Sequence, residues 1–300
     1  MKYLFIVLTF TAFSFKMTAQ INGKVIDAKT NEAIIYTNIW IENQQIGTTT
    51  NEDGFFKFDE LSDTLTLVFS ALGYETKHLK VNDLSTAIAL EPIAIELETV
   101  TVLSPNFRKE KRTGKIRKKG IDFWFGASKS PWRIGKIFPY DEEYEESPFI
   151  KKIDLCVNAH ERNRQILIHI LEVGEGTPDN WEILEQNILH TIPKSGENIT
   201  TIDLESYQVK MQKSGVMIVV EWLIIENNRY EYEYTDWKTE EKKLGLRYEP
   251  SVGTVPVETT ENIWQYSRGS WRRDYRKSGT QLKKYDNKYT ELAMELILSD

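Results

Sequence analysis

The side chains that could perform catalysis are few and scattered. Glu221 interrupts the apolar run from Met217 to Leu223, and Glu172 ends the apolar stretch from Gln165 to Leu171. Two carboxylates on one concave sheet could hydrolyse a glycosidic bond, and a buried Glu221 with a raised pKa could serve as the acid. The favoured interpretation of Glu221 is nevertheless a strand-edge or salt-bridged carboxylate. Glycan hydrolysis by paired carboxylates is therefore kept as a second hypothesis.

Other catalytic and metal-binding patterns are absent from the sequence. The histidines His78, His160, His169 and His190 include no His-Glu-x-x-His pair for zinc. There is no Gly-x-Ser-x-Gly nucleophile turn and no glycine-rich loop that could hold phosphates. In their apolar surroundings, His169 is expected to be a hydrogen-bonded core histidine and Cys156 a buried, inert thiol. The sequence thus predicts no catalytic residue, no metal site and no cofactor.

Two aromatic clusters are more informative about binding. Tyr230, Tyr232 and Tyr234 alternate with glutamates, so they share one face of a strand, and Trp237 follows them. Further along, aromatic and arginine residues interleave around a Gly-Ser pair, which is typical of a surface loop or hairpin. Exposed rings can stack on sugars, and guanidinium groups bind carboxylates. We predict that this second cluster is a surface binding patch made of Trp264, Tyr266, Arg268, Trp271, Arg272 and Tyr275. The alternative for both clusters is a sandwich core with an arginine-rich rim.

The first 20 residues have the order of a secretory signal peptide. A lysine near the start is followed by an apolar run and then by the small-residue site Thr18-Ala19-Gln20. The run is shorter than the ~20 residues needed to cross a bilayer, and no later segment is apolar over that length. The single cysteine is far from the cleavage site, so neither a lipid anchor nor an internal disulfide is expected. The chain is predicted to be exported to the periplasm or cell envelope.

The charge of the chain argues against nucleic acid as a partner. The formal net charge is −7, and removal of Lys2 and Lys16 with the signal peptide would change it to 36 − 45 = −9. The remaining 300 − 20 = 280 residues are enough for two domains. We expect a non-catalytic binding or structural-interaction protein whose partner is an envelope protein or a glycan.

The segment from residue 21 to about residue 92 alternates apolar and polar residues between turn clusters, as short strands do. Its motifs are Ile21-x-Gly23-x-Val25-x-Asp27, Thr30-x-Glu32-x-Ile34, Gly47-Thr48-x-Thr50-x-x-Asp53-Gly54-x-Phe56 and Ser70-x-x-Gly73-Tyr74. They resemble the carboxypeptidase regulatory-like, or transthyretin-like, family. The resemblance implies a prealbumin-like β-sandwich over residues 21–103 and is nearly silent about chemistry.

Composition changes after this domain. Residues 104–120 are rich in cations and are expected to form a basic linker, against which the acidic run from Asp141 to Glu146 could fold back. Alternation then returns, so residues 121–300 are predicted to form a second, jelly-roll-like β-sandwich. A turn or two of helix is expected between Pro178 and Leu189. The whole mature chain is therefore expected to be all-β.

Overall fold

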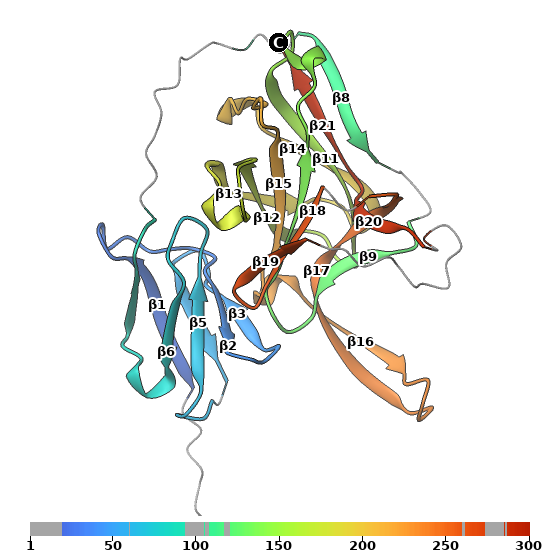
Figure 1. Ribbon diagram of the computed structural model, residues 1–300. Coiled ribbons are helices and arrows are strands. Elements are labelled where there is room, and N and C mark those ends of the chain that lie inside the picture. The colour runs from blue at the N-terminus through green and yellow to red at the C-terminus, as the bar shows by residue number, and fades with distance from the viewer. Residues whose placement is uncertain are drawn as a thin grey trace, which may run out of the picture.

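The computed structural model describes residues 20–59, 61–93, 105, 108–116, 121–259, 262–273, 285 and 287–300. The predicted signal peptide lies outside these residues, apart from Gln20. The described residues are all-β, as the alternation predicted: their helical segments are short 3-10 turns, and the strands form two separate sandwiches (Figure 1). No helix in this described part is long and apolar enough to cross a membrane.

The first sandwich has two sheets. The smaller sheet has the order β4-β1-β7, composed of Phe55–Phe58, Ile21–Asp27 and Ala87–Leu90. The larger has the order β3-β2-β5-β6, composed of Gly47–Thr49, Asn38–Ile41, Thr66–Ser70 and Lys77–Lys80. Alternate side chains of β1 turn inward, and Val25 and Leu90 pack with Ile39 and Phe69 in a core of its own. Gly54 has φ +77° in the turn before β4, a conformation that glycine adopts without steric cost.

The second sandwich is built from a six-stranded sheet and a larger antiparallel sheet. The six-stranded sheet has the order β13-β12-β15-β10-β18-β19: Ile183–Ile192, Arg164–Glu172, Val216–Trp222, Arg133–Phe138, Ile263–Ser267 and Ser270–Arg273. The other has the order β16-β17-β11-β21-β8: Arg229–Thr235, Lys242–Val257, Phe149–Ala159, Met294–Ser299 and Glu110–Lys115. Three further strands pair with it: β14 (Gly196–Asp203) with β11, and β9 (Trp124–Ala127) and β20 (Tyr289–Leu292) with β17.

The two central strands of the six-stranded sheet are buried on both faces. One face of β12 and β15 contributes Ile168 and Val220 to the main core, where they pack with Leu155 and Leu296 of the opposite sheet. The other face contributes Leu171 and Val219 to a second apolar cluster, distinct from the main core. A β-strand needs continuous apolar sequence only when both faces are covered. The second face of β12 and β15 must therefore pack against another part of the protein.

One expectation about local structure was wrong. Residues 110–115, expected to belong to the linker, form β8, because their backbone completes the edge of β21 in the register Glu110↔Ser299 to Lys115↔Met294. Lysines on such an edge strand also discourage further pairing. The short helix expected between Pro178 and Leu189 is present as a single 3-10 turn, Pro178–Asn180. Thr177 precedes it without a side-chain cap, and strand β13 follows.

The acidic run does fold back against the basic segment. Lys111 forms an ion pair with Glu143, and Lys109 Nζ lies 3.5 Å from the Glu146 carboxylate. Most of these side chains are well exposed to solvent, so the pairs contribute little to stability.

Candidate functional site

The first domain covers the outer face of the six-stranded sheet. Backbone and side-chain hydrogen bonds join the domains: Gly47 N donates to Lys129 O at 2.7 Å, and Ile224 N donates to Thr49 Oγ1 at 3.0 Å. Tyr36 of the first domain packs with Leu167 and Leu223 of the second. The ribbon of the first domain accordingly lies alongside the strands of this sheet (Figure 1). This layer explains the apolar outer face of β12 and β15.

A buried charge cluster lies in this interface. Arg133 Nε donates to Glu221 Oε2 at 2.5 Å, and Arg133 and Glu221 are 2% and 1% exposed. His169 Nε2 lies 2.8 Å from Glu221 Oε2, and Asn38 of the first domain donates through Nδ2 to Glu221 Oε1 at 2.6 Å. Each carboxylate oxygen thus has a donor, and one donor comes from the other domain.

The tautomer of His169 follows from the hydrogen bond at its other ring nitrogen. The backbone N–H of Asn187 donates to His169 Nδ1 at 3.1 Å, so Nδ1 is an acceptor and the ring proton sits on Nε2. The ring is 1% exposed. The prediction of a hydrogen-bonded core histidine is confirmed, and both ring nitrogens are already engaged, which leaves His169 without a free nitrogen to act as a base.

Glu221 is salt-bridged to Arg133, as the favoured interpretation predicted, and the raised pKa that the hydrolase hypothesis needs is wrong. Burial by itself would raise the pKa, but the charge of Arg133 and the hydrogen bond from His169 outweigh it and lower the pKa to about 2. Glu172 is not its partner: Glu221 pairs with Leu167 across β12 and β15, whereas Glu172 pairs with Val216 at the far end of both strands. These two residues are therefore an unsuitable acid and nucleophile pair.

Cys156 is fully buried, as predicted, and burial raises the pKa of its thiol to about 12. A protonated, inaccessible thiol is inert as a nucleophile. Among the described residues, no group of three or more His, Cys, Asp or Glu side chains is arranged to hold a metal ion.

The predicted binding patch is divided by the structure into buried rings and exposed cations. Trp264, Tyr266 and Trp271 are 6%, 4% and 5% exposed, so the expected exposure of Trp271 was wrong. They pack with Trp181 and with Leu72 of the first domain, and the Tyr266 hydroxyl lies 2.8 Å from Ser70 Oγ. The rings form part of the contact between the domains. Tyr275 lies outside the described residues.

Arg268 and Arg272 instead line a pocket of about 330 Å³ beside the interface. Both side chains are exposed, and they come from the turn and strand after β18. The other lining residues are Gln45, Gly126, Ser128, Ser130, Pro131, Trp132 and Ser267. Gln45 belongs to the first domain, so both domains contribute to the wall. Arg272 Nη2 donates to Ser267 Oγ at 2.7 Å, which orients the guanidinium group.

The pocket combines two guanidinium groups with three hydroxyls and an indole. Guanidinium groups bind carboxylate and phosphate oxygens in a bidentate manner, and hydroxyls can complete such a site. The sequence indicated Arg268 and Arg272 but not the serines, Gln45 or Trp132. The only sequence signal in this region was the Ser-Lys-Ser-Pro turn from Ser128 to Pro131. Nothing in that turn indicated a contact with arginines more than 130 residues away.

The comparison with curated proteins gave no match for this chain. Residues 21–102 match the family model of the CarboxypepD_reg-like domain, a region that begins with β1 and contains the whole first sandwich. The amino-terminal part of the chain is therefore a carboxypeptidase regulatory-like domain with a prealbumin-like fold.

Proposed function

We propose that this protein is a non-catalytic binding protein of the cell envelope that recognises an anionic group of an envelope glycan or protein. The observation that carries the proposal is the pocket lined by Arg268, Arg272 and three serines at the junction of the two domains. Its size suits a sugar ring or a short acidic side chain rather than a large cofactor. The signal-like amino terminus supports the envelope as the location.

The carboxypeptidase regulatory-like domain has an accessory role in this proposal. It contributes Gln45 to the pocket wall and holds the neighbouring segment through the hydrogen bond from Gly47 N to Lys129 O. Leu72 of this domain also packs against the buried cluster that contains Trp264 and Trp271. The domain thus supports the strands β18 and β19 from which the pocket arginines extend, and a supported site loses less conformational entropy on binding.

Titration calorimetry of the full chain tests this proposal with two anionic probes. Trigalacturonate carries carboxylates and glucose 6-phosphate carries a phosphate. The probe that binds more tightly therefore shows which of these two anionic groups the pocket recognises. The double change Arg268→Gln and Arg272→Gln should weaken binding at least about tenfold, and added salt should weaken binding to the unchanged protein. Lys242→Gln removes an exposed cation elsewhere and should leave affinity unchanged. Failure of both anions to bind would contradict the proposal.

A further inference from the structure

A β-hairpin extends away from the second sandwich. It is formed by β16 and the first part of β17, paired from Arg229↔Tyr248 to Thr235↔Lys242, and Figure 1 shows it pointing away from the other strands. The tip residue Trp237 is 83% exposed, and Tyr232 and Tyr234 are 37% and 44% exposed. These residues contribute little to the core, so their size and aromatic character need another explanation.

The exposed tyrosines form a row on one face. The ring centroids of Tyr230 and Tyr232 are 6.2 Å apart with planes 12° from parallel, and those of Tyr232 and Tyr234 are 6.0 Å apart at 43°. Tyr232 and Tyr234 remain 37% and 44% exposed in this row. The tyrosines therefore present aromatic surface along the hairpin.

Gly245 allows the central ring to lie flat. It is directly opposite Tyr232 in the register, and a Cβ added there would lie 2.5 Å from Tyr232 Cζ and 2.8 and 2.9 Å from the two Cε atoms. These three distances place the added Cβ above the plane of the Tyr232 ring. One face of the ring therefore lies against the backbone of Gly245, and its other face is turned away from the hairpin. Any larger residue would lift the ring.

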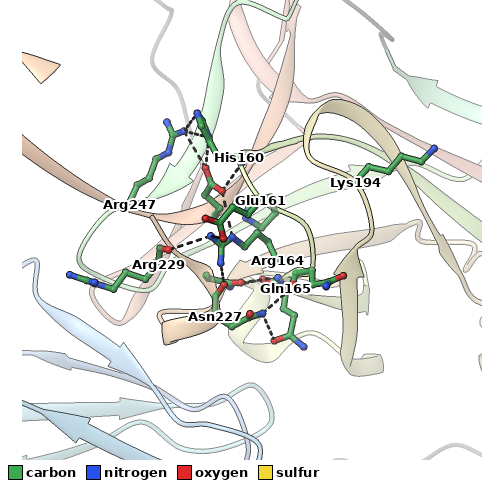
Figure 2. Close-up of polar contacts among 12 residues, drawn as sticks. His160, Glu161, Arg164, Gln165, Lys194, Asn227, Arg229 and Arg247 are labelled. Atoms are coloured by element: carbon green, nitrogen blue, oxygen red, sulfur yellow. Dashed lines mark hydrogen bonds and ion pairs between the residues drawn. The ribbon is translucent and has the colours of Figure 1, made fainter. Parts of the chain in front are cut away.

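The base of the row is held by a buried carboxylate. Glu249, which is 0% exposed, accepts a hydrogen bond from His160 N at 2.8 Å and one from Arg247 Nη2 at 3.2 Å. His160 stacks on Tyr230 with centroids 4.1 Å apart, and Arg247 lies 5.1 Å from the Tyr230 ring centroid. Figure 2 shows Arg247 reaching His160, with Arg164 nearby. Tyr230 is therefore an anchor. Arg247 also lies 5.3 Å from the ring centroid of Tyr232, so the accessible aromatic surface consists of the exposed part of Tyr232 and of Tyr234 beyond it.

The charges of the hairpin cancel. Residues 229–247 contain five cations and five anions. On the tyrosine face, Lys243 Nζ donates to Asp236 at 2.6 Å and Arg247 pairs with Glu249. The exposed Leu244 is opposite Glu233, so it lies on the other face. The tyrosine face thus offers rings and hydroxyls whose neighbouring charges are paired, which favours an uncharged ligand; the cation nearest the tip is Lys238, whose Nζ lies 5.1 Å from the Trp237 ring centroid.

We propose that this face, made of Tyr232 and Tyr234 with Trp237 beyond them, binds a neutral β-1,4-linked glycan. The pyranose rings of such a chain are extended and flat, and their C–H faces stack on aromatic rings while tyrosine hydroxyls bond the sugar hydroxyls. A protein partner would be anchored by side chains that protrude into pockets, whereas here the central ring lies flat against backbone. The site is separate from the arginine pocket and does not depend on it.

The full chain is titrated with cellohexaose and chitohexaose by calorimetry. Binding of at least one is expected, and Tyr234→Ala should weaken it about tenfold or more because that ring is exposed and distant from the buried base. Tyr234→Phe should retain most of the affinity if the ring face is the contact. Maltohexaose, an α-linked chain that curves, should bind at least about tenfold more weakly.

Leu244→Ala is the matched control, since it removes an exposed apolar side chain from the opposite face of the same hairpin. It should leave the affinity unchanged, as should the double change of Arg268 and Arg272 to Gln. Unchanged unfolding midpoints of the variants show that the fold is intact. The proposal is overturned if neither β-linked hexaose binds, or if Leu244→Ala weakens binding as much as Tyr234→Ala.

Discussion

Asn38 and Glu221 are 183 residues apart and belong to different domains, yet the amide nitrogen of Asn38 donates to the carboxylate of Glu221 at 2.6 Å. The same carboxylate binds Arg133 and His169, and all four side chains are almost inaccessible to solvent. Buried polar groups cost free energy unless each finds a partner. The amide of the first domain therefore completes a charge network of the second, which gives the two domains a specific polar contact as well as an apolar one.

Glu221→Ala should destabilise the protein by about 3 to 5 kcal/mol, because it leaves the Arg133 charge buried without a counter-ion. Asn38→Ala leaves the ion pair in place and should cost only about 1 to 2 kcal/mol. Chemical denaturation of both variants measures the difference. Equal losses would show that the charge pair is not the main component of the network.

The low pKa of Glu221 makes stability fall in acid. A carboxyl with a folded pKa of about 2, against 4.5 for an ordinary glutamate, stabilises the fold fully above pH 4.5 and loses that contribution as the pH falls toward 2. Unfolding free energies at pH 5, 4 and 3 should decline in the unchanged protein. In Glu221→Gln, which starts from a lower stability, the decline should be smaller; an identical decline would assign the acid sensitivity to other groups.

The lowered pKa of His190 predicts a second pH range in which acid reduces the stability of the fold. Burial lowers the pKa of His190 from 6.5 to about 4, while Nε2 lies 2.6 Å from Thr200 Oγ1. Between these two pH values the unfolded chain binds a proton that the folded chain does not, so stability should fall as the pH drops from 6.5 to 4. His190→Gln should reduce the slope in this range. An unchanged slope in His190→Gln would assign the loss of stability to other groups.

Trp271 and Trp237 allow the removal of a buried tryptophan to be compared with the removal of an exposed one. Trp271 is 5% exposed in the contact between the domains, and Trp237 is 83% exposed on the hairpin. Trp271→Ala should lower the free energy of unfolding by about 3 to 5 kcal/mol, and Trp237→Ala should change it by less than about 0.5 kcal/mol. Guanidinium denaturation of both variants measures these values, and a small loss for Trp271→Ala would contradict its place in the interface.

A fragment of residues 21–103 should fold alone, because the core of the first sandwich is separate from the cores of the second. Hydrogen exchange should find protected amides in β1, β2 and β5. The fragment will be only marginally stable, as small domains are, and it loses the contacts of Asn38 and Ser70 with the second domain. Amides that all exchange at the rate of an unfolded chain would refute the expectation.

Short-range patterns were sufficient for the first domain and for the all-β character of the second, but not for β8. The alternation around Val25 and the motif that ends in Asp53-Gly54-x-Phe56 predicted the β-sandwich of the first domain. These features depend on the two-residue period of a strand and on backbone conformations that few residues adopt, and neighbouring residues display both. The chemistry of Glu221 did not follow from its neighbours, since Arg133, His169 and Asn38 are distant in the chain.

From the sequence alone it follows that the described protein is all-β, that its first sandwich is of the carboxypeptidase regulatory-like type, and that aromatic and arginine residues interleave around Gly269 and Ser270 in a loop or hairpin. The three-dimensional fold was needed to show that the first domain covers Trp264, Tyr266 and Trp271 while Arg268 and Arg272 line an open pocket. Alternation along a strand separates two faces, but it carries no information about which face another domain will cover. That choice depends on complementary apolar and polar groups such as Leu72, Ser70 and Asn38, which the fold brings together from nearly 200 residues away.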